Sequence, residues 1–311
     1  MAEPADPHRP LTVAERAVRV VLTLVARLPL WVFRALGWVL GQGLYLFAVR
    51  RRHIALTNLE LCFPDWSAER RRKTVQRYFV VLGQTLWDRI WLWHAPVALL
   101  ERRLSIHGDI QRFGIPGPRV VFVPHFEGLD VGGLWMSYLT QRDWYFVYVP
   151  QQWSSLERWF YDGRTRFGLH PVPRRLGIKP VFKALRDGGI LHLSPDMDLG
   201  RKDAVFVPFF AHEHTATVTS LGRLASMTDA PVCGLVTQLT PQGYTITLTE
   251  DWASYPSGDD VADAREMNRR LEAWILQHPE QYHWSHRRFK SQPVGISSPY
   301  GPSRETRAGR Q

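Results

Sequence analysis

The first fifty residues of the chain carry two different apolar patterns. In Leu11–Leu28, valines and leucines alternate with arginines in a helix-like rhythm, which predicts an amphipathic helix. The stretch that follows, Leu28–Val49, is 22 residues long and contains one charged residue, Arg34. Because a helix needs roughly 20 mostly apolar residues to cross a bilayer, this stretch predicts a helix in contact with a membrane.

Whether Leu28–Val49 spans the bilayer or lies in its interface is left open by the pattern. Pro29, several glycines and the charge of Arg34 disfavour a simple spanning helix, and the tryptophans favour the interface. If the helix spans, the basic cluster Arg50–Arg52 keeps the rest of the chain in the cytoplasm. An apolar core helix is the alternative. A cleaved signal peptide is not expected, because the stretch has no small-residue cleavage site.

The rest of the chain changes from a helical to a mixed pattern. From His53 to Arg103 the rhythm is helical, with a turn at Phe63–Trp66 and a helix cap at Ser67. After the breaker Gly114–Pro118, runs of β-branched residues alternate with helical windows, which predicts an α/β fold with a mixed sheet flanked by helices. The expected strands are Val120–Val123, Trp144–Val149, Ile190–Leu193 and a hairpin of Val232–Leu239 with Tyr244–Thr249, and the expected helices include Lys179–Asp187 and one from Asp259 or Asp260 to about Gln277.

Composition and charge narrow the class of protein. The chain of 311 residues with 45% apolar residues can bury a full core without a disulfide or metal. Its formal net charge of +10 predicts an acidic partner, which is nucleic acid, anionic lipid, a phosphorylated substrate or an acidic carrier protein. The cysteines, Cys62 and Cys233, are far apart and form no disulfide framework or zinc motif, which fits a reducing, cytoplasm-facing location.

His125 directly follows a predicted buried strand, and Asp130 comes five residues later. The two side chains can meet only if the histidine lies in the turn before a helix, because five residues on one helix point in different directions. A neutral imidazole there would remove a proton from a hydroxyl, while Asp130 would hold the other ring nitrogen. The alternative is a purely structural role, in which the histidine lies beside an acidic residue at the start of a helix.

Other charged side chains follow turns where ligands often bind. Asp196 and Asp198 come after the strand Ile190–Leu193, at the edge where sheets of this type place ligands. Arg201 on the same turn, and the pair Arg164 and Arg166 near a glycine, are candidates for phosphate binding. The structural alternatives are an Asx-type turn and solvated surface arginines.

Several separate segments occur in an order typical of one enzyme family. They are Asn58-Leu59…Cys62-Phe63-Pro64, His125…Asp130, Arg164…Arg166, Pro195–Gly200, Val205–Phe210 and Pro279–Lys290. Together they resemble the lipid A late acyltransferases of Gram-negative bacteria, within the lysophospholipid acyltransferase superfamily. The resemblance covers most of the chain, from about residue 16 to residue 300. The aromatic segments Val205–Phe210 and Pro279–Lys290 are more specific for this family than the His-x4-Asp spacing.

The resemblance implies a glycerolipid acyltransferase-like fold and an O-acyltransferase. The donor would be an acyl carrier protein thioester, and the acceptor a hydroxyl of a phosphorylated lipid A precursor, Kdo2-lipid IVA or its monoacylated product, in lipopolysaccharide biosynthesis. His125 would be the base with Asp130 as its partner, and Arg164 and the turn Asp196–Asp198 would border the site. Members closest to the laurate transferase often have Glu in place of Asp130. No metal ion, cofactor or nucleic acid is expected.

The patterns along the chain and the resemblance together predict how the chain is divided and where it lies in the cell. Residues 1–52 would form a membrane-anchoring segment, residues 53–300 the acyltransferase catalytic domain, and residues 301–311 a flexible tail. The expected location is the bacterial inner membrane, with the catalytic domain on the cytoplasmic side.

Alternative functions remain open from the residues alone. One is acyl transfer to another glycolipid or lysolipid, such as ornithine lipid. A second is a metal-dependent hydrolase, although no ligand spacing of the His-x3-His type supports it. Its metal ligands would come from His125, Asp130, His192, Asp196 and Asp198. A third is a non-enzymatic binder of membrane or nucleic acid, whose action in cells would not depend on His125.

Overall fold

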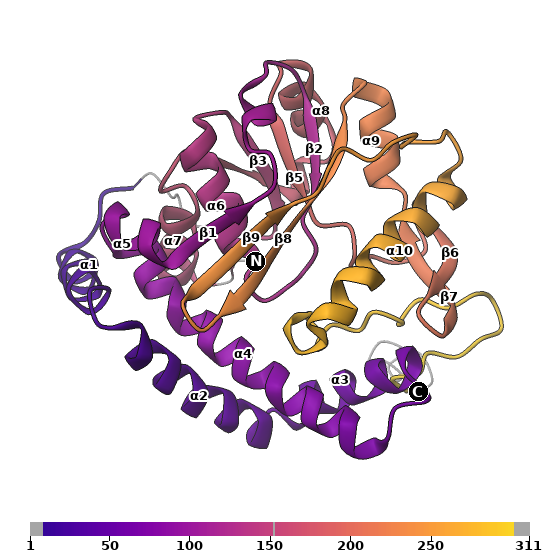
Figure 1. Cartoon of the computed structure of the whole chain (residues 1–311), viewed down its shortest axis with the longest axis horizontal. Coiled ribbons are helices and arrows are strands. Elements are labelled where there is room, and N and C mark those ends of the chain that lie inside the picture. The colour runs from indigo at the N-terminus through magenta and orange to yellow at the C-terminus, as the bar shows by residue number, and fades with distance from the viewer. Residues whose placement is uncertain (1–8, 152, 302–311) are drawn as a thin grey trace, which may run out of the picture.

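The structure is a computed structural model that describes residues 9–151 and 153–301, so all of the predicted tail except Gly301 lies outside the described residues. Its centre is a mixed seven-stranded sheet with the order β1-β9-β8-β2-β5-β3-β4, and β6 and β7 form a separate two-stranded sheet (Figure 1). The strands are β1 Leu104–His107, β2 Arg119–Phe122, β3 Trp144–Tyr148, β4 Leu169–Pro173, β5 Ile190–Leu193, β6 Ala204–Phe209, β7 His212–Val218, β8 Val232–Thr240 and β9 Gly243–Leu248.

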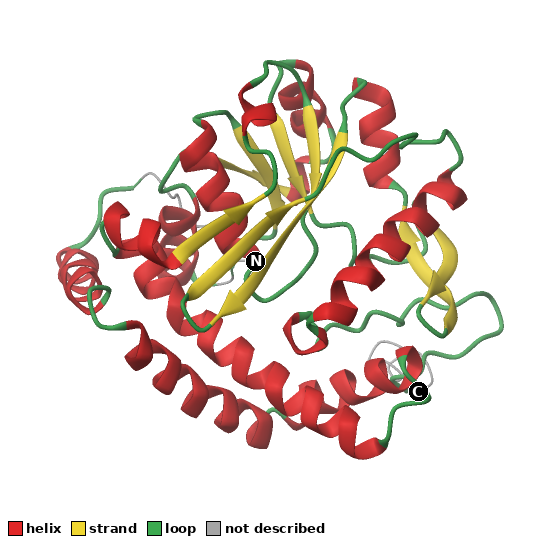
Figure 2. Cartoon of the chain, in the orientation of Figure 1, coloured by secondary structure: helices red, strands yellow, loops and turns green. Residues whose placement is uncertain are grey.

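Helices surround the large sheet on both faces and extend beyond it (Figure 2). They are α1 Val13–Val25, α2 Leu30–Phe47, α3 Val49–Cys62, α4 Ala68–His94, α5 Val97–Arg103, α6 Leu129–Thr140, α7 Ser154–Arg164, α8 Lys179–Arg186, α9 Ser220–Thr228 and α10 Asp260–Gln277, with short 3-10 turns η1 Gln111–Gly114, η2 Arg174–Leu176 and η3 Pro279–Gln281. Neighbouring strands of the large sheet are parallel except β8 and β9, which form the predicted antiparallel hairpin. The prediction of an α/β fold with a mixed sheet flanked by helices is confirmed.

The core consists of two apolar clusters, one on each face of the sheet. Successive side chains of a strand point to opposite faces, and β2 and the residue after it show this directly. Val120 and Phe122 belong to one cluster, together with α8, α9 and α10, whereas Val121 and Val123 belong to the other, together with α5 and α6. After Arg119, strand β2 is apolar because both of its faces are covered.

Helix α4 is 27 residues long and contributes to both clusters. It begins after the predicted cap Ser67, whose side chain accepts a hydrogen bond of 3.1 Å from the backbone N–H of Arg70. Tyr78 near its middle is buried in one cluster, and Trp91 near its end is buried in the other. These aromatic side chains of α4 are thus part of the core, and the helix runs beneath the sheet (Figure 1).

Helix α2, formed by the apolar N-terminal stretch, packs along α4 with little space between the two backbones. An added Cβ at Gly83 of α4 would lie 2.2 Å from the carbonyl oxygen of Gly37 in α2. An added Cβ at Gly41 would lie 2.5 Å from the carbonyl oxygen of Phe79. Glycines at these positions allow the close approach, and α2 is consequently attached to the folded body along its length.

Four strands, β1, β4, β6 and β7, were not predicted, and prolines account for two of these misses. β4 contains Pro171 and Pro173, and β6 contains Pro208, which argues against a strand because proline cannot donate to a ladder. The structure places β4 at an edge of the large sheet and β6 in a two-stranded sheet, where a missing donor is tolerated. β1 is also an edge strand, with only four residues.

We expect Gly83→Ala to lower the free energy of unfolding by about 1–3 kcal/mol, because the new methyl group would overlap the α2 backbone. Gly43→Ala is the matched control, since its added Cβ would have no atom within 4 Å. Removing a glycine from a helix there should be neutral or stabilise by about 0.5–1 kcal/mol. Thermal and denaturant unfolding of the protein in detergent, followed by circular dichroism, measures both. Equal stability of the two variants would contradict the tight α2–α4 contact.

Candidate functional site

His125 lies in the turn between β2 and α6, and its imidazole is held by a buried carboxylate. Its Nδ1 is 2.6 Å from Oδ1 of Asp196, and its backbone N–H donates to the other oxygen of the same carboxylate at 2.9 Å. The Asp196 side chain is fully buried, whereas that of His125 is 25% exposed. Within the part of the chain that the structure describes, no side chain bonds to Nε2. One ring nitrogen is therefore fixed and the other is left for a ligand.

The sheet explains why these two residues meet although they are 71 positions apart. β2 and β5 are adjacent and parallel, and their last residues, Phe122 and Leu193, are register partners. His125 and Asp196 each follow their strand by three residues, so both turns emerge at the same edge. This is the edge at which open α/β sheets bind ligands.

The contact predicted between His125 and Asp130 is replaced in the structure by a different set of ion pairs. Asp130 lies in the first turn of α6, where one of its oxygens accepts from Nε of Arg89 at 3.0 Å and the other from Nε of Arg164 at 2.9 Å. The physical reason is direction: the turn aims His125 toward the end of β5, whereas the start of α6 aims Asp130 toward α4 and α7.

The pKa values of both carboxylates are lowered because neighbouring charges and hydrogen bonds outweigh their burial. Burial by itself raises the pKa of Asp196, but the charge and hydrogen bonds of His125 bring that pKa below its ordinary value. Burial also raises the pKa of Asp130, and the charges of Arg164 and Arg89 more than compensate, so its pKa lies well below the usual range. The site therefore presents two fixed negative charges, each matched by a cation or an imidazole.

Asp198, on the same turn as Asp196, makes hydrogen bonds within this turn and to the C-terminal segment. Its carboxylate accepts from the backbone N–H of Gly200 at 3.0 Å and from that of Ser291 at 2.7 Å. Its own backbone N–H donates to Nε2 of His286 at 3.1 Å. The side chain is 1% exposed. These bonds fit the Asx-type turn considered above, and they join that turn to the C-terminal segment.

The three predicted phosphate-binding arginines have different surroundings. Arg166 donates to the backbone oxygens of Leu92, at 2.8 Å, and Ala95. It therefore caps the C-terminal end of α4. Arg201 is exposed, and among the described residues it reaches only the carbonyl oxygen of Pro293, at 3.4 Å. Arg164 uses Nε for Asp130, and its terminal nitrogens donate to no residue among those described. Of the three, Arg164 alone is joined to the cluster around His125 and Asp130.

A second histidine–carboxylate pair, missed by the sequence analysis, lies beside the first. Nδ1 of His283 is 2.7 Å from Oε1 of Glu127, and the backbone N–H of His283 donates to the carbonyl oxygen of His125 at 2.9 Å. Burial lowers the pKa of His283, but the Glu127 carboxylate more than offsets this, so that pKa is raised. His283 belongs to the segment Pro279–Lys290, but nothing in the spacing of that segment indicates a partner 156 residues away.

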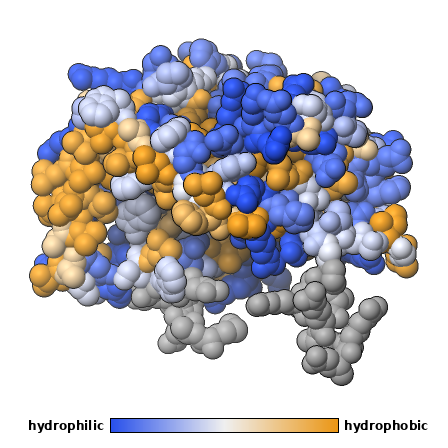
Figure 3. Space-filling model, turned by 90° about the horizontal axis from the view of Figure 1, so that it is seen from below, coloured by the Kyte–Doolittle hydropathy of each residue, from blue (hydrophilic) through white to orange (hydrophobic). Residues whose placement is uncertain are grey.

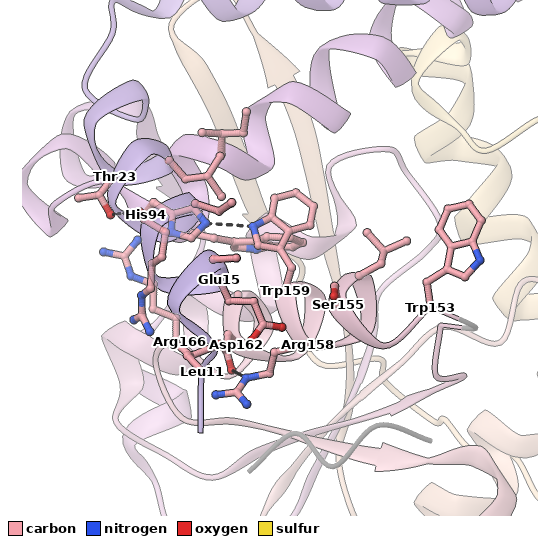
Figure 4. A pocket seen from close by; sticks show the side chains of 18 of the residues that line it. Leu11, Glu15, Thr23, His94, Trp153, Ser155, Arg158, Trp159, Asp162 and Arg166 are labelled. Atoms are coloured by element: carbon pink, nitrogen blue, oxygen red, sulfur yellow. Dashed lines mark hydrogen bonds and ion pairs between the residues drawn. The ribbon is translucent and has the colours of Figure 1, made fainter. Parts of the chain in front are cut away.

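An apolar groove of about 930 Å³ lies between α1, α4 and α7 (Figure 4). Leu22, Ile90 and Leu156 line it, and Trp159 donates from its ring N–H to Nε2 of His94 at 3.0 Å on its wall. His125, Asp130 and Asp196 do not line it. The groove is therefore separate from the histidine site, although α7 supplies both the wall of the groove and Arg164.

Comparison with known proteins gives the family. The family model described as "Bacterial lipid A biosynthesis acyltransferase" matches residues 9–291. The lipid A biosynthesis lauroyltransferase of Escherichia coli K12 is 34% identical over 290 residues, which are 90% of this chain and 92% of that enzyme. The palmitoleoyltransferase of the same organism is also 34% identical, over 286 residues with the same coverage. The myristoyltransferase is 29% identical over 265 residues, 81% of this chain and 78% of that enzyme.

The chain belongs to the bacterial lipid A biosynthesis acyltransferase family. It is therefore an acyltransferase of lipid A biosynthesis, and the family expected from the six segments is confirmed.

Membership of an acyltransferase family argues against the alternative of a metal-dependent hydrolase. The surroundings of the residues suggested as metal ligands argue against it too. Asp130 is occupied by two arginines and Asp198 by backbone N–H groups. His192 is buried in β5, and desolvation there lowers its pKa to about 3. Across residues 9–151 and 153–301, no group of three or more His, Cys, Asp or Glu side chains is arranged to hold a metal ion.

We expect the pair Glu127–His283 to make the stability of this acyltransferase depend on pH. The folded-state pKa of His283 is raised above its ordinary 6.5, so the stability that the pair contributes is complete below 6.5 and is lost as pH rises through the raised value. The melting temperature of Glu127→Gln should therefore fall furthest below that of the wild type at about pH 6 and approach it at about pH 9.

Glu60→Gln, at an exposed carboxylate on α3, is the matched control and should show a small difference that does not change with pH. Melting curves at one ionic strength between these two pH values give the comparison. A difference for Glu127→Gln that stayed constant over the range would mean that His283 does not titrate with Glu127.

Proposed function

We propose that the protein transfers a fatty acyl group from an acyl carrier protein thioester to a hydroxyl of a lipid A precursor, Kdo2-lipid IVA or its monoacylated product, with His125 as general base. The observation that carries the proposal is the buried Asp196 carboxylate on Nδ1 of the partly exposed His125. This arrangement is what an acyl transfer to a hydroxyl needs, because a hydroxyl is a weak nucleophile until a base removes its proton.

The chemistry follows from the protonation of the ring. The ionised Asp196 accepts a hydrogen bond from Nδ1–H, so the lone pair of neutral His125 is on Nε2. Nε2 takes the proton of the acceptor hydroxyl as its oxygen attacks the thioester carbonyl. The tetrahedral intermediate then collapses, the C–S bond breaks, and the proton passes from Nε2 to the departing thiolate. Asp196 stabilises the imidazolium formed between these steps.

Asp130 acts in this proposal as a positioning residue. Its ion pairs with Arg89 and Arg164 fix the start of α6 against α4 and α7, and the turn that carries His125 leads directly into that helix start. The terminal nitrogens of Arg164 are available to an anionic group of the substrate, and this side chain is 20% exposed. A guanidinium held through Nε can bind a phosphate with its other two nitrogens.

The proposed location is the bacterial inner membrane, with the catalytic domain on the cytoplasmic side. Two properties support it. α2 is long and apolar enough to cross a membrane by length and composition, and the net charge of +10 complements anionic headgroups, substrate phosphates and an acidic carrier protein. A lipid acceptor and an acyl carrier protein donor would meet at such a surface.

We expect His125→Ala to reduce transfer by about 10²–10⁴-fold, since this is the usual contribution of a positioned general base. Asp196→Asn should cause a large loss too, and the double variant should be no slower than His125→Ala alone, because the carboxylate acts only through the ring. Purified protein, acyl carrier protein thioesters and lipid A precursor, with products measured by mass spectrometry, provide the rates. Full activity of His125→Ala would refute the proposal.

Asp130→Asn should behave differently from Asp196→Asn. We expect it to lower the free energy of unfolding by about 3–5 kcal/mol, because two partly buried arginines lose their anion. Part of its effect on the rate should appear as a raised KM, because Asp130 also holds Arg164, whose terminal nitrogens are available to an anionic group of the substrate. If Asp130→Asn left the melting temperature and KM unchanged but lowered kcat as much as Asp196→Asn, Asp130 would be the partner of the ring.

A further inference from the structure

Helix α2 is the one helix among the described residues that is long and apolar enough to cross a membrane. Its inward face, however, is committed to the folded body. Phe33, Gly37 and Gly41 are buried at intervals of four residues along one side. An added Cβ at Gly37 would lie 2.4 Å from Cα of Gln84 in α4. The two helices are thus in backbone contact, and α2 would have to give up this contact to stand upright in a bilayer.

A buried ion pair opposes that separation. Arg34 of α2 is paired with Asp88 of α4, which is 1% exposed. Arg34 also donates to the carbonyl oxygens of Thr240, at 3.3 Å, and Gly243, at 3.1 Å, at the turn between β8 and β9. If α2 left α4 to cross the bilayer, Asp88 would stay buried without its cation, and Arg34 would enter hydrocarbon. Both changes are strongly unfavourable.

The outward face of α1 and α2 has no partner within the described chain. Exposed apolar side chains on α2 include Trp31 and Trp38, and Phe47 at its end is 85% exposed. α1 adds Val13, Val20, Val21 and Leu24 to the exposed apolar side chains, and Figure 3 shows apolar residues gathered on one side of the face that carries these helices. Soluble monomers rarely leave an apolar surface of this extent uncovered.

The charges beside this surface indicate what covers it. Arg16, Arg19 and Arg27 are exposed on or directly after α1, and Arg50 is exposed just after α2. None of the four has an ion pair among the described residues. Arginines that flank exposed tryptophans, with no acids to neutralise them, are complementary to anionic headgroups above an acyl layer.

From these observations we propose that α1 and α2 both lie in the plane of one leaflet of an anionic bilayer, with α2 fixed on α4 and not crossing the membrane. The residues before α2 are then on the same side as the sheet. The inference rests on the membrane contact in the proposed function but on none of its chemistry, so that acyl transfer would stand if the inference failed.

Cysteine accessibility tests the topology directly. Arg16→Cys is on the exposed polar side of α1, before α2, and Glu60→Cys is on an exposed position of α3, after α2. Both native cysteines, Cys62 and Cys233, are buried and give little background. In intact spheroplasts, a membrane-impermeant maleimide should label neither variant, and both should be labelled once detergent is added. Labelling of Arg16→Cys alone in intact spheroplasts would show that α2 crosses, and would overturn the inference while leaving acyl transfer untouched.

Vesicle flotation tests the surface itself. We expect the full-length protein to float with phosphatidylglycerol vesicles, and the triple variant Trp31→Ala, Trp38→Ala, Phe47→Ala to bind them about tenfold or more weakly. The control replaces exposed apolar residues outside α1 and α2, Ile115, Met227 and Val294, by Ala and should float like the wild type.

Melting curves show whether each variant is folded before it is compared. Equal flotation of the triple variant and the control would contradict the proposal. So would a wild-type protein that ignores vesicles but self-associates on a sizing column through Trp31, Trp38 and Phe47, because the face would then be an interface between copies of this chain.

Discussion

The buried carboxylate of Asp88 is the constraint on which the arrangement of the helices around the sheet depends. A charge removed from water costs several kcal/mol unless it is paired and fully hydrogen-bonded. The chain meets this requirement with three donors: Arg34 from α2, the hydroxyl of Tyr244 from β9 at 2.7 Å, and the ring N–H of Trp91 one turn further along α4 at 2.8 Å. One side chain therefore ties the N-terminal helix, the sheet and the long helix together.

The next residue of α4 connects this same helix to the candidate site. Arg89 points about 100° away from Asp88 around the helix and pairs with Asp130 at the start of α6. His125 lies in the turn before the start of α6, and Asp196, which follows the neighbouring strand β5, contacts its ring. The site is held by the sheet from one side and by α4 from the other, which keeps the His125 side chain in a single orientation.

Local patterns were sufficient for the strands that are covered on both faces, because continuous β-branched runs leave few alternatives. They also placed His125 at a strand end. They could not select its partner, because the choice between Asp130 and Asp196 depends on β2 and β5 being neighbours, and strand order is not encoded in spacing. The pair Glu127–His283 was missed for the same reason. Arg166 was read as an anion binder because its role at the end of α4 requires knowing where that helix ends.

The continuity of α4 has a consequence for how the enzyme meets its substrate. A helix of 27 residues is about 40 Å long, and it touches α2 along one side while Arg89 on another side pairs with the start of α6, next to the turn that carries His125. No hinge interrupts it between these contacts. If α2 rests on the bilayer, the elevation of His125 above the lipid is built into the fold. An acceptor hydroxyl at a different distance from the membrane surface would not reach the ring. The distance between the hydroxyl and the bilayer would then determine which hydroxyl groups the enzyme can acylate.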